Sequence, residues 1–372
     1  MNHDHLSPGP IRVLITDDSA FMRTALTRMI QSDPALLVVG TAQNGKEALE
    51  QITRLDPDVI TLDIEMPLLN GLGVLRRLQQ ENPKPVIMVS SLTQEGAEAT
   101  LEAFELGAFD CIAKTRSFAT LDILNIREEL TSKIKAAAHS GRSRPQPVRS
   151  PAPPAAAPRR IKFSNRVSRR EGFAPSIVAI GTSTGGPKAL QEVLPLLPPD
   201  LPAGIVIVQH MPEGFTGPFA QRLNSRSQIQ VREAVDGEPV APGIALIAPA
   251  TWHLTFVRAS PSQFNIRLSK EPANTLHRPS VDVTLLSAAE VCGPQAMGVI
   301  MTGMGADGAL GMKALHDRGG FTLGQDESTC AVYGMPRSCA EMGSLDRVVP
   351  LLQIPEEIVH ATSGSQLESR VG

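Results

Sequence analysis

Short apolar runs alternate with segments of helical periodicity over the first third of the chain. Between residues 11 and 135 the strand candidates are IRVLIT, LLVVG, DVITL, PVIMV and FDCIA, and a helix-like segment follows each of them. Near-continuous apolar strands that alternate with helices are typical of a parallel sheet covered on both faces. The pattern predicts a doubly wound α/β domain over residues 11–135.

The same pattern returns at Ile177. Its strand candidates are IVAIG, GIVIVQ, GIALIAP and MGVIMT, and a helix-like segment at 354–360 ends it. Within this region HLTFVRASPSQFNIRLS alternates apolar and polar residues around a turn, which is typical of an antiparallel hairpin. We therefore expect a second α/β domain over residues 175–362, with a mixed sheet.

The intervening residues 136–174 are rich in Pro, Ala, Ser and Arg and show no apolar periodicity. This composition favours an extended linker, because it offers no apolar face to bury. Between His139 and Gly172 eight Arg and one Lys stand against one Glu, so the segment is basic. An arm that binds nucleic acid or an acidic partner is the alternative interpretation, and the scarcity of aromatic residues disfavours it.

The length of 372 residues fits two or three domains, and 42% hydrophobic with 20% charged residues is typical of a soluble globular protein. A net charge of −3 provides no general attraction to nucleic acid or anionic membranes. The four cysteines form no C-x-x-C pair, no signal peptide is evident, and no apolar run is long enough to span a bilayer. We expect a reduced cytoplasmic protein that neither binds nucleic acid nor inserts into a membrane.

Polar side chains follow four strands of the first predicted sheet. They are Asp17 and Asp18 after the first strand, Asp63 after the third, Ser90 after the fourth and Lys114 after the fifth. Because the carboxyl ends of parallel strands meet at one edge, we expect these groups to converge. Three carboxylates repel one another unless a hard cation such as Mg²⁺ neutralises them.

This set of groups suits phosphoryl transfer onto a carboxylate. Asp63 would attack, while the cation and Lys114 neutralise the developing charge. The simpler interpretation is that each aspartate caps a helix or a turn. Polar groups after four separate strands are more than capping requires.

The acidic pair Asp17/Asp18, the run LDIEMPLLNGL and Lys114 together resemble the response-regulator receiver domain, which is flavodoxin-like, over about residues 11–135. The resemblance implies that a histidine kinase phosphorylates Asp63 and that Asp17, Asp18 and Asp63 hold Mg²⁺, with Ser90 and Lys114 supporting the phosphate. Two positions depart from the family pattern. Cys111 replaces an aromatic switch residue, and Thr115 replaces a proline.

Three further polar residues follow separate strands of the second domain. Ser183 lies in a G-x-S-x-G pattern after IVAIG, His210 follows GIVIVQ, and Asp307 lies in the Gly-rich segment after MGVIMT. The other seven histidines lie in tails, in the linker or without a strand directly before them. The residue types at one sheet edge predict a catalytic triad.

In this triad His210 would take the proton of the Ser183 hydroxyl and Asp307 would orient the imidazole. Backbone N–H groups are the oxyanion donors, and the candidates are those around Thr184, Gly185 and Met304. For each residue alone a simpler interpretation exists: an anion-binding turn, a packed histidine and an ordinary turn aspartate. Together these simpler interpretations require three coincidences.

The chain order Ser, His, Asp differs from that of common α/β-hydrolases. With the motifs GTSTGGP, QHMPEGFT, HRPSVDVT and TGMGADGALGM, this order resembles the catalytic domain of chemotaxis-type protein-glutamate methylesterases, a Rossmann-like domain, over about residues 175–362. The resemblance implies hydrolysis of glutamate methyl esters, and deamidation of glutamines, on chemoreceptor cytoplasmic helices. No cofactor is implied for ester hydrolysis.

Two other classes of function remain as alternatives at this point. The chain would be a response regulator acting on a non-chemotaxis signalling protein, or its second domain would only bind, for instance to DNA or to a nucleotide. The absence of a helix-turn-helix signal, of G-x-x-x-x-G-K-[ST] and of G-x-G-x-x-G disfavours the binding alternatives.

Overall fold

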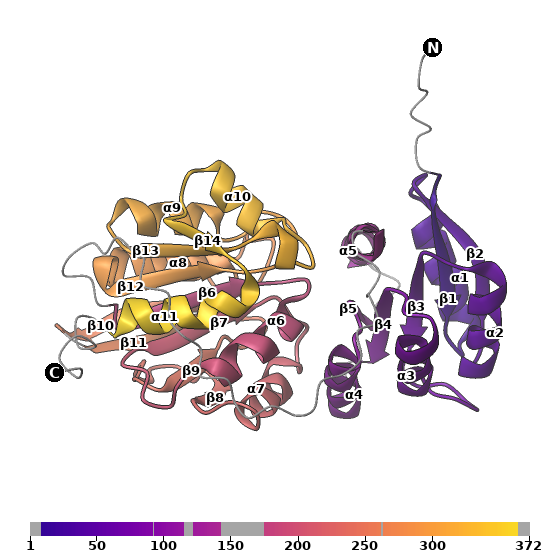
Figure 1. Cartoon of the computed structure of the whole chain (residues 1–372), viewed down its shortest axis with the longest axis horizontal. Helices are drawn as coiled ribbons and strands as arrows, with labels where there is room; N and C mark the ends of the chain where they lie inside the picture. Colours follow the sequence, from indigo (N-terminus) through magenta and orange to yellow (C-terminus); the bar gives the residue numbers. More distant parts are fainter. Residues whose placement is uncertain (1–8, 92, 115–121, 143–174, 262, 364–372) are drawn as a thin grey trace, which may run out of the picture.

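The computed structural model describes residues 9–91, 93–114, 122–142, 175–261 and 263–363, which form two α/β domains (Figure 1). Thr115 and most of the predicted linker lie outside these residues. Helix α5 continues to Arg142, past residue 136 where the linker is predicted to begin. In the described part of the chain, no helix combines the length and apolarity that crossing a bilayer needs.

The first domain contains a five-stranded parallel sheet in the order β2-β1-β3-β4-β5. All five predicted strands are present, within two residues of the expected ends. The elements are β1 (Ile11–Thr16), α1 (Ala20–Gln31), β2 (Leu36–Ala42), α2 (Gly45–Leu55), β3 (Val59–Asp63), α3 (Gly71–Glu81), β4 (Val86–Ser91), α4 (Gln94–Glu105), β5 (Asp110–Lys114) and α5 (Asp122–Arg142).

Helices cover both faces of this sheet because the strands are apolar on both sides. Val13 of β1 packs with α1 and α5, whereas its neighbour Leu14 packs on the opposite face with α2 and α3. The helices begin at polar caps. The Ser19 side chain accepts from the N–H of Met22 at α1, and the Asn44 side chain accepts from the N–H groups of Lys46 and Glu47 at α2. The strand order reverses between β1 and β3, so the loops after these two strands lie side by side.

The second domain contains a seven-stranded sheet in the order β14-β13-β12-β6-β7-β9-β8. Its strands are β6 (Ile177–Thr182), β7 (Gly204–Gln209), β8 (Gln230–Glu233), β9 (Ile244–Ile247), β12 (Ala296–Ile300), β13 (Phe321–Gln325) and β14 (Arg347–Val349). Its helices are α6 (Gly186–Val193), α7 (Thr216–Asn224), α8 (Val281–Val291), α9 (Ala309–Asp317), α10 (Met335–Glu341) and α11 (Ile354–Thr362).

Two apolar layers hold this second sheet. Ile180 and Ile207 pack on the face covered by α6, α7 and α11, while Ala179 and Val206 pack on the face covered by α8, α9 and α10. The chain runs outward from β6 in both directions, so the loops after β6, β7 and β12 meet at the centre of the sheet edge. The candidate triad residues lie on these loops.

The predicted hairpin is present as β10 (His253–Ser260) and β11 (Gln263–Ser269), paired antiparallel. The expectation of a mixed sheet is wrong in one respect: the hairpin forms its own two-stranded sheet, and every pairing in the seven-stranded sheet is parallel. Side chains of α8 take up the polar groups of β10. Thr284 Oγ1 donates to Leu254 O, and Ser287 Oγ accepts from Phe256 N.

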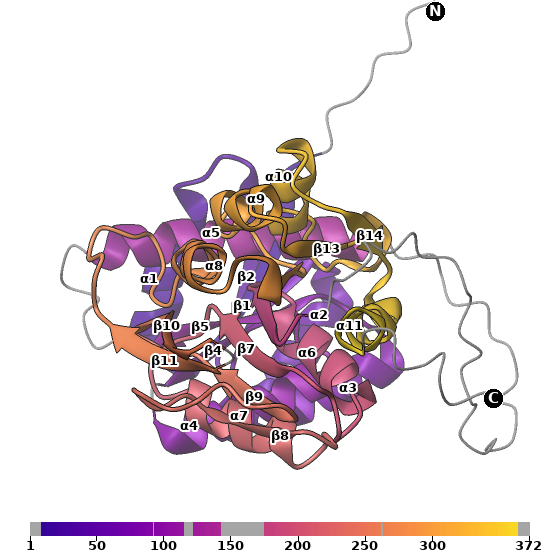
Figure 2. The same ribbon diagram turned by 90° about the vertical axis from the view of Figure 1, so that its left-hand side faces the viewer.

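The two domains contact each other through α4 of the first domain and α6 and α7 of the second. Leu101 and Phe104 of α4 belong to the same buried apolar cluster as Leu190 of α6. At the end of α4 the Glu105 carboxylate bonds the Arg222 guanidinium of α7. Figure 1 shows α4, α5 and β5 on the side of the first domain that faces the second. In Figure 2, which looks from the second domain, α4 lies next to α7.

Two candidate functional sites

Ser183 lies on the turn between β6 and α6. All residues of β6 are buried, and Gly185 adopts φ 77°, in the left-handed region, directly before the first turn of α6, which contains Pro187. A Cβ at residue 185 would lie 2.4 Å from Ala331 Cβ, so both the conformation and the space require glycine there. Ser183 N donates to Thr302 O at 3.0 Å, which ties the turn to the strand end of β12.

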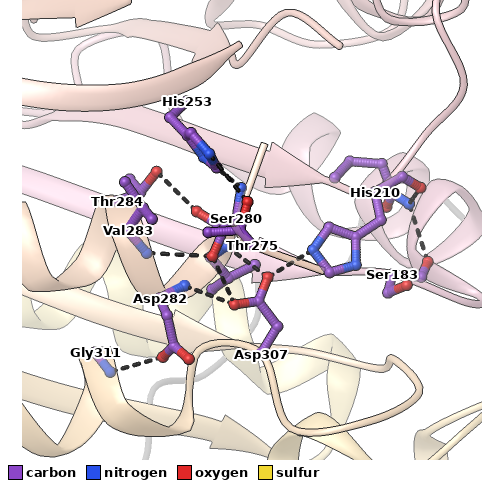
Figure 3. Close-up of polar contacts among 12 residues, drawn as sticks. Ser183, His210, His253, Thr275, Ser280, Asp282, Val283, Thr284, Asp307 and Gly311 are labelled. Carbon is purple, nitrogen blue, oxygen red and sulfur yellow. Dashed lines mark hydrogen bonds and ion pairs between the residues drawn. The ribbon is translucent and has the colours of Figure 1, made fainter. Parts of the chain in front are cut away.

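His210 and Asp307 meet at the same sheet edge, as Figure 3 shows. His210 Nε2 lies 2.8 Å from Asp307 Oδ2. The other ring nitrogen, Nδ1, is buried and has no hydrogen-bond partner among the described residues. In this part of the chain no hydrogen bond joins Ser183 Oγ to the ring, so Nδ1 is the atom that remains available to the serine.

Asp307 is anchored by the start of α8. Its carboxylate accepts hydrogen bonds from Ser280 Oγ at 2.8 Å, Val281 N at 2.7 Å and Asp282 N at 2.9 Å. Burial raises the pKa of Asp307, but the bond and charge of His210 and the backbone donors outweigh burial and lower this pKa to about 2. The carboxylate is therefore ionised at neutral pH.

Two residues of this site carry no role in the sequence-based prediction. Ser280 caps α8 and bonds Asp307, and the His277 ring stacks on that of His210 with 4.0 Å between centroids. Both lie in the motif HRPSVDVT. A serine directly before an apolar helical run is a recognisable N-cap signal, whereas the contact with Asp307 depends on how α8 packs.

The oxyanion candidates surround Ser183. Thr184 is buried, and its carbonyl accepts from Thr302 Oγ1 at 2.9 Å. The loop that carries Met304 passes close to the serine, since a Cβ at Gly303 would lie 3.0 Å from Ser183 Cβ. Backbone groups of two loops therefore border the serine: the turn after β6, which contains Thr184 and Gly185, and the loop after β12, which contains Met304.

The second site gathers Asp17, Asp18 and Asp63 at the edge of the first sheet, with one oxygen of each within 4.8 Å of the others. Asp17 and Asp63 are buried and Asp18 is exposed. Lys114 Nζ lies 3.0 Å from Asp17 Oδ2 and 2.7 Å from Asp63 Oδ2. One ammonium group does not neutralise three carboxylates, so a hard divalent cation with oxygen ligands fits this cluster.

Burial has the largest effect on the pKa of Asp63. It raises the pKa of Asp63 to about 6, with the Asp17 charge adding to the rise and Lys114 opposing it. Burial lowers the pKa of Lys114, but the bond to Asp63 and the charges of Asp63 and Asp17 outweigh it, so the net shift is upward. The site thus holds its negative charge only at a cost that a bound cation would relieve.

The structure places the remaining residues predicted for this domain as follows. Ser90 is buried near the strand end and donates to Gly96 O at 3.1 Å, so its hydroxyl is not bonded to the carboxylates. Cys111 is buried in β5 and packs in the apolar core, and burial raises the pKa of its thiol to about 12. This thiol is not ionised near neutral pH.

Comparisons with known proteins match both domains. The model of the response regulator receiver domain covers residues 13–124, and that of the CheB methylesterase covers residues 178–358. The crystal structure of the Thermotoga maritima CheB methylesterase catalytic domain is 44% identical, with a TM-score of 0.49, and the match covers 50% of this chain and 98% of that one.

Full-length relatives match as well. The protein-glutamate methylesterase/protein-glutamine glutaminase 1 of Oleidesulfovibrio alaskensis is 49% identical over 366 residues, covering 94% of this chain and 99% of that protein. The enzyme of the same name from Symbiobacterium thermophilum is 47% identical, covering 95% and 97%. The chain therefore belongs to the protein-glutamate methylesterase/protein-glutamine glutaminase family, with a receiver domain joined to a methylesterase domain.

Proposed function

We propose that this chain is a phosphorylation-controlled serine hydrolase that removes methyl groups from glutamate methyl esters, and deamidates glutamines, on chemoreceptors during chemotaxis adaptation. The observation that carries the proposal is the His210–Asp307 hydrogen bond beside Ser183, at one edge of the sheet. A positioned base, an acid that orients it and a serine are the groups that ester and amide hydrolysis require.

In this mechanism Ser183 Oγ attacks the γ-carbonyl carbon and His210 Nδ1 takes the hydroxyl proton. The tetrahedral intermediate collapses, His210 returns the proton, and methanol leaves an ester substrate or ammonia leaves an amide. Water then attacks the acyl-serine with His210 again as base, and a free glutamate side chain and the Ser183 hydroxyl result. Asp307 stays ionised throughout and stabilises the imidazolium, which its low pKa permits.

The intermediate carries a negative oxygen that needs fixed donors. We assign this role to backbone N–H groups around Thr184, Gly185 and Met304, whose loops border Ser183. Backbone donors of this kind lower the barrier because they are oriented before the reaction begins.

We further propose that a histidine kinase phosphorylates Asp63. Asp17, Asp18 and Asp63 would hold Mg²⁺, which supplies charge neutralisation during phosphoryl transfer. Lys114, already 2.7 Å from Asp63 Oδ2, would pair with the phosphoryl oxygens, and the Ser90 hydroxyl would turn from Gly96 O to donate to them. Because a histidine kinase and chemoreceptor cytoplasmic helices are the proposed partners, we propose a cytoplasmic location. Nucleic acid has no role in this proposal.

The control we propose is occlusion of the serine hydrolase site by the unphosphorylated receiver. Helix α4 packs on α6 and α7, and the charges of Glu129 and Lys133 on α5 are close enough to influence the pKa of His277, which stacks on His210. We propose that a receptor helix approaches Ser183 from this side, which the packed receiver would block. Phosphorylation of Asp63 would favour an open arrangement of the two domains.

The test is hydrolysis of methylated receptor by the full chain, with and without phosphodonor. We expect phosphodonor to raise the turnover of the wild type and not that of Asp63→Asn. Ser183→Ala should abolish both turnover and labelling by a fluorophosphonate. Labelling that persists in Ser183→Ala would remove this serine from the mechanism, and equal turnover with and without phosphodonor would remove the proposed control.

A further inference from the structure

A buried amide links the backbones of the two reacting residues. Gln209 is the last residue of β7 and is 1% exposed. Its Nε2 donates to Ser183 O at 3.0 Å and to His210 O at 2.8 Å. One side-chain NH₂ group therefore joins the turn after β6 to the turn after β7.

The orientation of this amide follows from its surroundings. Two carbonyl oxygens face one end of the group, and since carbonyls only accept hydrogen bonds, the nitrogen must point at them. The opposite atom, Oε1, is buried and has no hydrogen-bond partner among the described residues. It lies against Gly186, where a Cβ would be 2.0 Å away.

A buried acceptor without a donor destabilises the fold. An apolar side chain at this position would avoid that penalty but would also remove the donor to Ser183 O and His210 O. The stability that the glutamine contributes therefore comes from this link between the two carbonyls. What the amide provides is a fixed spacing between two backbone segments. These segments carry the Ser183 hydroxyl and the His210 ring, whose Nδ1 is also unpartnered.

We infer that Gln209 is a positioning residue that sets the distance between Ser183 Oγ and His210 Nδ1. The inference rests on the roles proposed above for these two residues. Proton transfer depends steeply on geometry, and a displacement of about 1 Å costs about 100-fold in rate. Gln209 touches neither substrate nor reacting atoms, so its effect should appear in turnover rather than in substrate binding.

The test uses Gln209→Met, which keeps the length of the side chain and removes both donors, and Gln209→Glu, which keeps the shape but can donate to at most one of the two carbonyls, and only when its carboxyl group is protonated. In full-length phosphorylated protein we expect each variant to lower kcat on methylated receptor by about 10- to 100-fold, with KM changed by less than about threefold. Fluorophosphonate should label both variants to completion. The rate of labelling should be lower than that of the wild type by about the same 10- to 100-fold.

The matched comparison is Gln325→Met. Gln325 is also a buried glutamine at a strand end, and its amide joins Thr302 N to Thr329 O. It contacts neither Ser183 nor His210 and reaches the serine turn only through Thr302, whose carbonyl accepts from Ser183 N. We expect Gln325→Met to lose about as much thermal stability as Gln209→Met, and to lose less kcat. An equal loss of kcat in both methionine variants, or wild-type labelling rates in Gln209→Met, would overturn the inference. Failure of the proposed triad is distinguishable, because then Ser183→Ala and His210→Ala would also retain turnover.

Discussion

Asp307 accepts four hydrogen bonds, three from the start of α8 and one from His210. These four hydrogen bonds fix the position of the carboxylate. Because an ionised carboxylate only accepts hydrogen bonds, the proton between the two groups lies on His210 Nε2. His210 Nδ1 is then the basic nitrogen, directed at the serine side of the site. The tautomer of His210 thus follows from the helix that anchors its partner.

We expect His210→Ala to lower turnover of methylated receptor by at least about 100-fold, because general-base catalysis contributes at least this factor. Asp307→Asn should keep the fold and lower the rate as well, since an amide cannot stabilise the imidazolium. Steady-state assays with circular dichroism as the control for folding measure both effects. Turnover near wild type in either variant would exclude that residue from the mechanism.

The buried His277 makes the stability of the folded protein depend on pH. Burial, followed by the charge of His210, lowers its pKa from 6.5 to about 4, while Asp307 and Glu129 oppose this change and Lys133 adds to it. Between these two pH values the unfolded chain binds a proton here that the folded chain does not. Stability from this residue is therefore complete above pH 6.5 and is lost as pH falls to about 4.

Replacing His277 by Phe keeps an aromatic ring on His210 and removes this titration. We expect the unfolding free energy of the wild type, measured by urea denaturation, to fall more between pH 6.5 and 4 than that of His277→Phe. The difference should be at most about 3 kcal/mol. Parallel pH profiles for the two proteins would show that His277 is protonated equally in both states.

At the scale of single elements, the N-terminus of α8 combines two functions. Ser280 Oγ accepts from Val283 N as the helix cap and donates to Asp307 Oδ1. The Ser280 N–H in turn donates to the buried His253 ring at Nδ1. The start of α8 therefore connects the hairpin, the helix and the candidate triad.

We expect Ser280→Ala to cost about 1 to 2 kcal/mol of unfolding free energy, because the helix loses its cap and Asp307 loses a donor. Ser280→Thr, which retains the hydroxyl, serves as the control. Denaturant unfolding of both variants measures the cost. A cost for Ser280→Ala no larger than for Ser280→Thr would argue that the backbone N–H groups of α8 alone hold Asp307.

The sequence predicted the α/β class and the hairpin correctly, because both depend on local apolar patterns. It did not predict β8, β13 and β14, which are only three to five residues long and include polar or glycine positions such as Gln230 and Gly324. Residues after strands were predictable as neighbours from topology. The contacts of Ser280, His277 and Gln209 were not, because they depend on how separate loops and helices pack.

At the scale of the whole molecule, the domain contact combines apolar and ionic groups. Leu101 and Phe104 of α4 share a buried cluster with α6. Beside this cluster Glu105 pairs with Arg222 of α7 and, at 2.6 Å, with Arg226. The Arg222 and Glu105 side chains are 27% and 18% exposed, so solvent screens this network less than an ordinary surface pair. No sequence pattern predicts such a contact, since it joins residues far apart in the chain.

Because Glu105 is the acidic partner of both arginines, its reversal should weaken the closed arrangement. We expect Glu105→Arg to raise the turnover of unphosphorylated protein about 5- to 30-fold, the equivalent of about 1 to 2 kcal/mol in the packing equilibrium. Adding Arg222→Glu should restore low turnover by re-forming the pair with opposite charges. Glu50→Arg, an identical change on the exposed face of α2 away from the second domain, controls for net charge (Figure 1). Turnover equal to wild type in Glu105→Arg would mean that the apolar contact of α4 with α6 holds the domains together without the ionic network.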